Sequence, residues 1–486
     1  MIKNNKVLKM YLNCYHMEIV HVSAECYPVA KVGGLGDVVG ALPKYQQQLG
    51  HTAKVVLPMY RTSFLYRHDW DVVHKGRTHL GNWWFDYTVI KERTNALGFD
   101  LYLIDIYGVL DREGVYGYRD DAERFTAFQV SFVDWLSQWK HRPNVVHVHD
   151  HHTGLVPFIM QYSYDYGHLK GIPTVLTIHN AQYQGWMGWD KSAYLPRYDP
   201  WKGGLLDWKG NINPLAAAVR CAWKVTTVSP SYLGELSYMS NGLEALFEYE
   251  KGKCSGILNG IDSQVWDPAT DTYLSTHFDH TSVREGKAAH KRALCKRFQL
   301  DDTKPLFVFI GRFVGEKAAD LLPAVVGDCF HYIGRTMNFL ILGSGDPNVE
   351  RHLLHVQEMV GKDFKLYKGY NEQLSHEMYA GADFLLMPSR VEPCGLNQMY
   401  ALRYGTIPVV RNTGGLRDTV VDIEDWQGFG IRFQDASVGD ITHAIHRALD
   451  LYQEQEQFAA IQERIMQIDH SWESSARQYL TLYPTV

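Results

Sequence analysis

The chain has 486 residues, a formal net charge of −6 and a pI near 6.4. This length exceeds what one hydrophobic core usually supports, so we expect two domains. The acidic balance and the lack of a basic run argue against nucleic acid or an anionic membrane as a partner. The 13 Trp and 30 Tyr residues leave a carbohydrate ligand open, because aromatic rings can stack on sugar faces, although most aromatic side chains fill cores.

Cysteine usage and the N-terminal sequence bear on the compartment. The seven cysteines show no C-x-x-C spacing, which favours a reducing environment. The first sixteen residues contain lysines but no apolar run of signal-peptide length, and 18 consecutive apolar residues occur nowhere. We therefore expect a soluble, cytoplasmic protein in which residues 1–16 form an extension without a structural role.

Short β-branched runs alternate with longer helical patterns through the first half of the chain. The expected strands are residues 18–24, 53–57, 101–106, 145–148, 174–178, 224–228 and 256–258. This alternation predicts right-handed βαβ units and a parallel sheet.

The pattern changes to mainly polar residues over 261–304, and we interpret this stretch as a linker region. Strands are expected again at residues 306–310, 338–342, 364–368, 384–388 and 407–410. The second half therefore predicts a second doubly wound α/β domain.

The turn at residues 390–395 lies between an expected buried strand and a helix predicted over 397–404. It holds Glu392 beside Pro393 and Gly395. Ligands of parallel sheets gather beyond the carboxyl ends of strands, where helix N-termini also attract anions. Glu392 is either a functional carboxylate or an acid that favours the positive end of the helix dipole.

Glycine-rich turns follow three other expected strands. They are Lys31 to Asp37 with Gly33-Gly34, the pair Gly311-Arg312, and Thr413-Gly414-Gly415. None is a G-x-G-x-x-G or Walker motif, and each alone could be a tight strand-to-helix connection. Three such turns together favour a phosphate-bearing ligand.

The densest polar cluster is formed by His147, His149, Asp150, His151 and His152. These residues could supply zinc ligands, but alternation along the strand separates residues 147 and 149 from 148, and the spacing matches no known zinc motif. Asp150 is interpreted as an acceptor for sugar hydroxyls or as a turn residue. The pair His179-Asn180 ends the next strand in the same way, so two strand ends deliver polar side chains to one edge.

Seven blocks of sequence carry a family resemblance. They are KVGGLGDV (31–38), HVHD (147–150), IHNAQYQG (178–185), LNGID (258–262), GRFVGEK (311–317), SRVEPCGL (389–396) and TGGLRDTV (413–420). In these blocks and their order the chain resembles bacterial glycogen synthases and plant starch synthases. The resemblance implies two doubly wound Rossmann-like domains that face a cleft, the glycosyltransferase B type. It also implies transfer of glucose, with retention, from ADP-glucose to the non-reducing end of an α-1,4-glucan.

The resemblance divides the chain into an acceptor-side domain (17–260), a nucleotide-sugar-binding domain (261–470) and a C-terminal helix returning to the first domain (471–486). It assigns catalytic positions to Glu392, Arg312, Lys317, His179 and Asp150. It assigns substrate-binding positions to Lys31, Gly33, Gly34, Asp37, Asn180, Asn259, Tyr370, Cys394, Gly395, Leu396, Thr413, Gly414 and Gly415.

Departures from the family pattern occur at Glu316, Ala318 and His151, where Gln, Gly and Trp are common. No cofactor or metal is expected, because Arg312 and Lys317 supply positive charge, and the only Asp-x-Asp pattern, Asp69 to Asp71, lies in a polar stretch interpreted as surface. Two alternatives stay open: a retaining transferase of the same fold with a small sugar acceptor, and a catalytically silent glucan-binding protein.

Overall fold

The computed structural model describes residues 16–484, which divide into two units. Unit 1 holds the described residues through Val228, together with Leu233–Ile257 and the chain from Trp472. Unit 2 holds Ser229–Tyr232 and Leu258–Ser471. The expected extension falls almost entirely on residues outside the described range.

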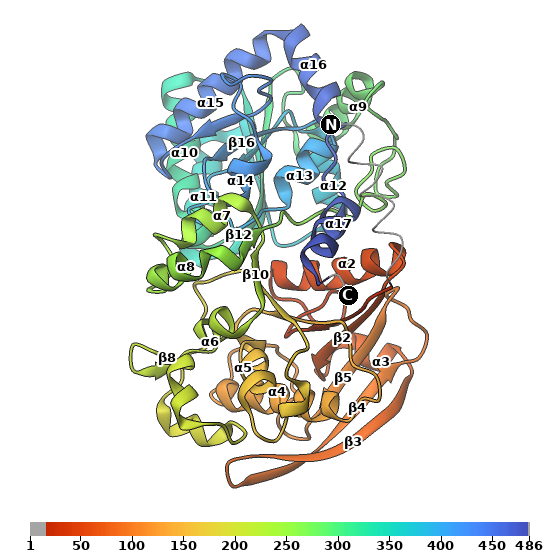
Figure 1. Cartoon of the computed structure of the whole chain (residues 1–486). Helices are drawn as coiled ribbons and strands as arrows, with labels where there is room; N and C mark the ends of the chain where they lie inside the picture. The colour runs from red at the N-terminus through yellow and green to blue at the C-terminus, as the bar shows by residue number, and fades with distance from the viewer. Residues whose placement is uncertain (1–15, 485–486) are drawn as a thin grey trace. The chain divides into compact units, whose positions relative to one another are not determined.

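Unit 1 is built on a nine-stranded sheet (Figure 1). In spatial order its strands are β11 (Cys254–Gly256), β10 (Lys224–Thr227), β7 (Thr174–Ile178), β6 (Val145–His149), β1 (Glu18–Val22), β2 (Thr52–Pro58), β5 (Asp100–Asp105), β4 (Trp83–Glu92) and β3 (Trp70–Leu80). The strands from β11 to β5 are parallel, and most of their side chains are buried because helices cover both faces. The strand order reverses between β1 and β6, which makes their carboxyl ends the switch point of the sheet.

The antiparallel hairpin β3–β4 is missing from the sequence prediction. Its strands carry many exposed polar side chains, so the apolar run that signals a buried parallel strand is absent. Asp69 and Asp71 lie at the start of this hairpin and are exposed, and Asp71 pairs with Arg93.

Helix α17 (Trp472–Leu482) belongs to unit 1 and packs beside α2 (Gly34–Gln48). Its apolar face, including Trp472 and Tyr479, joins a buried cluster with Val38 and Leu42 of α2. The other helices of this part of the chain are α3 (Ser63–Arg67), α4 (Asp121–Ser137), α5 (Val156–Tyr162), α6 (Pro214–Cys221), α7 (Pro230–Leu236) and α8 (Glu244–Glu250). The division between the units falls within α7.

Unit 2 is built on a six-stranded parallel sheet. In spatial order its strands are β14 (Phe364–Lys368), β13 (Asn338–Gly345), β12 (Leu306–Phe313), β15 (Phe384–Met387), β16 (Ile407–Arg411) and β17 (Ile431–Phe433). The order reverses between β12 and β15, so the switch point lies at the carboxyl ends of these two strands. The prediction of two doubly wound α/β sheets is confirmed.

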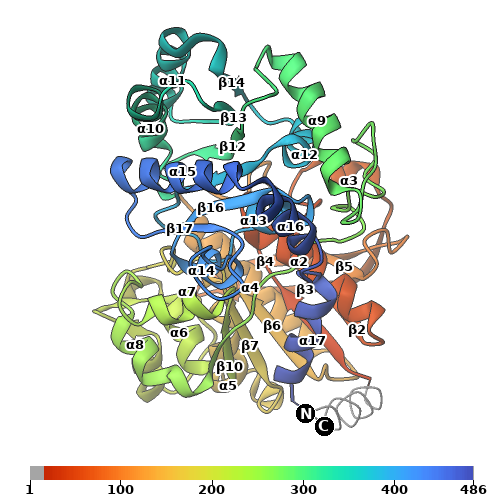
Figure 2. The same cartoon turned by 90° about the horizontal axis from the view of Figure 1, so that it is seen from above.

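Helices cover both faces of this sheet. Figure 2 shows α10 (Leu322–Asp328) and α11 (Pro347–Val360) on one side of β12 to β14, and α9 (Val283–Phe298) and α12 (Glu372–Gly381) on the other. Helix α15 (Val438–Gln453) packs with α10, whereas α13 (Asn397–Arg403) and α16 (Gln455–Ile465) pack with the α9 layer. The remaining helix is α14 (Gly414–Thr419).

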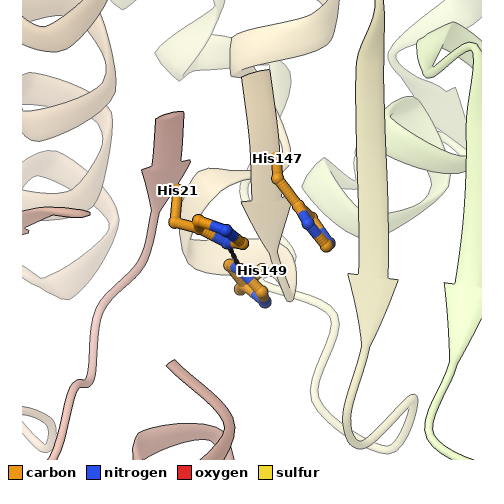
Figure 3. A group of neighbouring side chains, drawn as sticks. All are labelled: His21, His147 and His149. Carbon is orange, nitrogen blue, oxygen red and sulfur yellow. Dashed lines mark hydrogen bonds between the residues drawn. The ribbon is translucent and has the colours of Figure 1, made fainter. Parts of the chain in front are cut away.

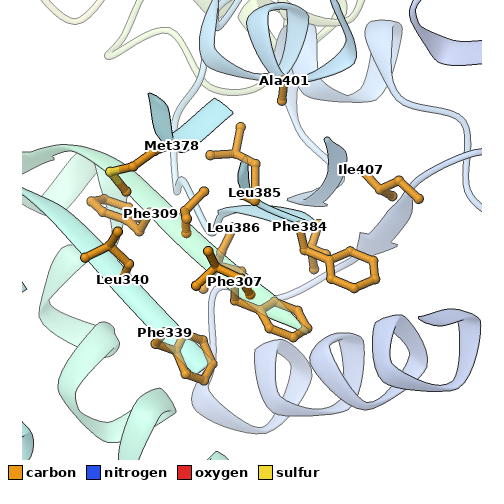
Figure 4. Packing of buried hydrophobic residues seen from close by; sticks show 14 of the residues in the cluster. Phe307, Phe309, Phe339, Leu340, Met378, Phe384, Leu385, Leu386, Ala401 and Ile407 are labelled. Atoms are coloured by element: carbon orange, nitrogen blue, oxygen red, sulfur yellow. The ribbon is translucent and has the colours of Figure 1, made fainter. Parts of the chain in front are cut away.

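The core of unit 2 forms around the two strands at the switch point (Figure 4). Phe307 of β12 stacks on Phe384 of β15 with ring centroids 4.8 Å apart, and on Phe339 of β13 at 5.4 Å. All three rings are buried. Each such ring contributes roughly 2–3 kcal/mol by leaving water, so this packing holds the strands that carry the site.

The linker interpretation of residues 261–304 is wrong over α9. The helix has a charged sequence, and apolar periodicity fails to reveal it because cations occupy part of its buried face. Lys287 is buried and donates to the carbonyls of Tyr379, Ala380 and Tyr404. Burial lowers the pKa of Lys287 to about 7.

Two further observations concern residues 16–484. No helix among them combines the length and apolar character needed to cross a membrane. The six cysteines within this range are free.

Candidate active site

Glu392 lies in the turn between β15 and α13 and is buried. Its Oε2 accepts a hydrogen bond from the Ser389 hydroxyl at 2.9 Å and forms an ion pair with the Lys317 ammonium group. Two sequence-predicted residues 75 positions apart are therefore in direct contact. The carboxylate is held in one orientation by both partners.

The turn itself is held by the short loop that carries Lys317. The backbone N–H of Arg390 donates to the carbonyl oxygen of Glu316 at 2.8 Å. The Arg390 guanidinium binds both carboxylate oxygens of Asp320, at 2.6 and 2.8 Å, a bidentate geometry that fixes its plane. The Glu316 side chain plays no part in these bonds, so this departure leaves the turn intact.

Gly414 and Gly415 begin α14 against the backbone of the same turn. A Cβ on Gly414 would lie 2.0 Å from the Glu392 carbonyl oxygen, and one on Gly415 would lie 2.0 Å from that of Cys394. The Gly415 N–H donates to the Glu392 carbonyl at 3.1 Å. These glycines are required by the close approach of two backbones, and Thr413 precedes them as the buried N-cap.

Arg312 lies near the carboxyl end of β12, next to β15 in the sheet. Its side chain is exposed and has no hydrogen-bond or ion-pair partner among residues 16–484. It forms no hydrogen bond or ion pair with Glu392 or Lys317. A free guanidinium at the switch point of an α/β sheet is placed to bind an anionic ligand.

Asn259 and Cys394 contact each other within unit 2. The backbone N–H of Asn259 donates to the Cys394 thiol, and burial raises the pKa of that thiol to about 12. The side-chain oxygen of Asn259 is buried and has no partner in the described structure. Such an atom normally finds a hydrogen-bond donor, so Asn259 fits a contact to a polar ligand.

Three other predicted site residues of unit 2 lie in turns or at the start of a helix. Gly395 has φ +75°, a left-handed conformation that favours glycine, and Leu396 is the N-cap residue of α13. Tyr370 lies between β14 and α12 and is 81% exposed, so it packs against nothing that would fix its ring.

The glycine-rich turn after β1 holds an internal carboxylate. Glu25 accepts from the backbone N–H groups of Val32 at 2.6 Å and Gly33 at 2.9 Å, and from the Tyr116 hydroxyl at 2.6 Å. Gly33, which the resemblance assigns to substrate binding, therefore binds Glu25 through its backbone N–H. Glu25 was not among the predicted site residues, although an acid three positions after the last residue of β1 was a usable signal.

The side chains around that turn are only partly free. Lys31 forms an ion pair with Asp37 of α2 at 2.7 Å. A Cβ on Gly33 or Gly34 would meet no atom within 4 Å, so the space beside these glycines is open.

Asp150 and His179 meet at the ends of β6 and β7. Oδ1 of Asp150 accepts from the His179 N–H at 2.7 Å, and the Asn180 N–H also donates to this carboxyl group. Desolvation by burial raises the pKa of Asp150 to about 7. Asp150 has φ 55° and ψ −173°, a strained conformation that costs roughly 1–3 kcal/mol and is typical of functional sites.

Three histidines approach one another beneath these strand ends (Figure 3). His147 and His149 share one face of β6, as strand alternation predicts, and His21 joins them from β1. Their nearest ring nitrogens lie within 4.8 Å of one another, and this is the one such group of three metal-binding side chains in residues 16–484. The rings bind each other and neighbouring polar groups, so a metal ion would have to replace those hydrogen bonds.

Two family models match the chain, a starch synthase catalytic domain over residues 18–249 and glycosyl transferases group 1 over residues 291–464. The glycogen synthase of Flavobacterium johnsoniae is 50% identical over 96% of this chain and 98% of its own length. The chain belongs to the glycogen and starch synthase family. This confirms the resemblance carried by the seven sequence blocks.

Other relatives of this glycosyltransferase agree. The glycogen synthase of Streptococcus gordonii is 37% identical over 97% of this chain and 100% of its own. The catalytic domain of starch synthase IV from Arabidopsis thaliana, solved with ADP and acarbose, has a TM-score of 0.86 and 32% identity, covering 96% of this chain and 99% of its own. A sucrose-phosphate synthase from Thermosynechococcus elongatus, with a TM-score of 0.62 and 18% identity over 96% of this chain and 98% of its own, shares the fold alone.

Proposed function

We propose that this glycogen synthase family member transfers glucose from ADP-glucose to the non-reducing end of an α-1,4-glucan, with retention of configuration. Membership of the family and the ADP-bound starch synthase relative support this donor and acceptor. The free cysteines in the described residues support the cytoplasm as its compartment.

The arrangement at the switch point of unit 2 carries the proposal. Glu392 and Lys317 form an ion pair beside β15, and Arg312 of β12 has no hydrogen-bond or ion-pair partner among residues 16–484. A sugar diphosphate gains negative charge on its leaving oxygen as the sugar departs, and fixed cations stabilise that charge most in the transition state. Lys317 and Arg312 supply such cations, and Glu392 supplies a carboxylate near the sugar that carries positive character.

In the proposed reaction the bond between C1 of glucose and the phosphate oxygen breaks, and a bond from C1 to an acceptor hydroxyl oxygen forms. The hydroxyl proton passes to the leaving phosphate, which departs as ADP. The protein then needs neither an oxidant nor a bound cofactor. Its cations take the role that a divalent metal has in other nucleotide-sugar transferases.

Residues of unit 1 are proposed to contact the sugar and the phosphates. Asp150 and His179 offer polar groups at a strained strand end. A phosphate at the Val32 and Gly33 N–H groups would have to displace Glu25, since that carboxylate binds them. We therefore expect Glu25 to change partners when the donor binds.

Product analysis tests this function. The protein is incubated with glycogen and ADP-glucose carrying ¹³C at C1, and the new linkage is examined by NMR. The proposal predicts an α-configured 1,4 linkage and one ADP released per glucose transferred. A β linkage, a glucosylated small sugar, or release of free glucose alone would contradict it.

A further inference from the structure

An unbroken chain of hydrogen bonds crosses the interior of unit 1. It joins a backbone carbonyl of β7 to the imidazole of His179, and every member is buried. The carbonyl of Leu176 can only accept, so it fixes the direction of the first bond. Thr226 donates its hydroxyl to this oxygen at 3.3 Å.

The direction then passes to His147. The Thr226 hydroxyl donates its one hydrogen bond to the Leu176 carbonyl. Its oxygen therefore accepts a hydrogen bond from the Thr177 hydroxyl at 2.6 Å. The Thr177 oxygen in turn accepts from Nε2 of His147, also at 2.6 Å. A neutral imidazole has one protonated nitrogen, so Nδ1 of His147 is an acceptor.

The C-terminal segment supplies the next link. The Tyr483 hydroxyl donates to Nδ1 of His147 at 2.8 Å and accepts from the amide nitrogen of Gln46 at 3.0 Å. This orients the Gln46 amide, whose oxygen therefore faces His21. An amide oxygen only accepts, so His21 donates its Nε2 proton to it, at 2.8 Å.

Two more hydrogen bonds connect His21 to His179. Nδ1 of His21 is an acceptor, so His149 donates from Nε2 at 3.0 Å. Nδ1 of His149 is then an acceptor, so His179 donates from Nε2 at 3.1 Å. This leaves Nδ1 of His179 unprotonated, and the described structure gives that nitrogen no partner.

The assignment of donors and acceptors requires four neutral imidazole rings, and burial keeps the rings neutral. Desolvation lowers the pKa of His21 to about 4 and that of His179 to about 3. It also lowers the pKa values of His147 and His149 well below the ordinary range. All four rings are therefore neutral at pH 7.

We propose that Gln46, His21 and His149 are positioning residues that fix the tautomer of His179, so that its Nδ1 accepts a hydrogen bond from a hydroxyl of the transferred sugar. The reverse tautomer would present a donor there instead. The use of this acceptor rests on the proposed function, whereas the tautomer itself does not.

Long-range ¹H–¹⁵N NMR of histidine-labelled protein tests the tautomer without substrate. The His179→Asn variant identifies the resonance, and the chemical shifts distinguish protonated from unprotonated ring nitrogens. We expect the His179 proton on Nε2 in the parent. A proton on Nδ1 would overturn the proposal.

The Gln46→Met variant removes the acceptor that orients His21 while keeping a side chain of similar size. We expect a mixed His179 tautomer and a fall in kcat/KM for ADP-glucose of roughly tenfold, as for outer partners that orient functional histidines. ADP affinity should not change, because ADP lacks the transferred glucose. Tyr483→Phe removes the partner of the Gln46 amide nitrogen and should shift the His179 tautomer in the same direction. This second variant keeps the proposal testable if Gln46→Met does not fold.

Gln129→Met is the matched control. Gln129 is also buried, and its amide accepts from the Leu155 N–H and donates to the Phe125 carbonyl. This variant should lower the melting temperature while leaving the His179 tautomer and kcat/KM unchanged. If Gln46→Met and Gln129→Met lowered kcat/KM equally, or Gln46→Met left the tautomer unchanged, the positioning role would be refuted. A parent that shows the Nε2 tautomer but no transfer from ADP-glucose would refute the proposed function and leave the tautomer relay standing.

Discussion

Lys317 pairs with the same carboxylate oxygen of Glu392 that accepts from the Ser389 hydroxyl. The two residues thus neutralise each other at the switch point of unit 2. A diphosphate that binds Lys317 would compete with Glu392 for the ammonium group. Donor binding and the state of the carboxylate are therefore coupled.

Replacing Glu392 by Gln should reduce transfer at least about a hundredfold while ADP affinity stays within a few-fold of the parent, because the carboxylate acts mainly in the transition state. Turnover and ADP titration measure the two effects. Glu316→Gln is the matched control, since it removes a neighbouring acid whose side chain does not hold the turn, and it should keep near-parental turnover. Near-parental turnover of Glu392→Gln would contradict a catalytic role and would favour the alternative, in which Glu392 only interacts with the positive end of the helix dipole.

Replacing Arg312 or Lys317 by Ala should each lower kcat by roughly a hundredfold to a thousandfold, as for loss of one preorganised donor to a developing charge. Because protein cations carry this charge in our account, activity should survive excess chelator. Activity that is abolished by chelator and restored by Mg²⁺ or Mn²⁺ would instead assign the charge to a metal ion.

Ala318→Gly should stabilise the protein by about 1 kcal/mol. Ala318 has φ 52° and ψ 32°, a left-handed conformation that costs an L-residue roughly 1–2 kcal/mol and glycine almost nothing. Ala319 has no left-handed φ, so Ala319→Gly should destabilise the protein instead. Urea unfolding of both variants measures the difference, and equal effects would exclude backbone strain at Ala318.

Stability should fall as the pH drops from about 6.5 to about 4. Burial lowers the pKa of His21 to about 4 from an ordinary value of 6.5, so in this window the unfolded chain binds a proton that the folded chain does not. The free energy of unfolding, measured with urea at pH 7 and pH 5, should show the loss. His21→Asn should reduce the pH dependence, whereas His446→Asn, at an exposed position, should not. An unchanged pH dependence in His21→Asn would count against a neutral buried His21.

The sequence predicted what depends on local pattern. Buried parallel strands such as β15 appear as continuous apolar runs, and the turn around Glu392 lies where that pattern places it. The hairpin β3–β4 was not predicted because it is largely exposed. Helix α9 was not predicted because it buries charged residues such as Lys287, which binds carbonyl groups. Gln46 was also not predicted, since its partner Tyr483 lies 437 positions away and only the tertiary fold brings the two together.

The rate of ADP release from ADP-glucose, with and without glycogen, tests the central claim most directly. Our account predicts ADP release that depends on glycogen, exceeds release of UDP from UDP-glucose, and persists in excess chelator. Release that required a small sugar in place of glycogen would indicate a different transferase of this fold. No release with either donor would contradict the assignment of Glu392, Lys317 and Arg312 to glucosyl transfer.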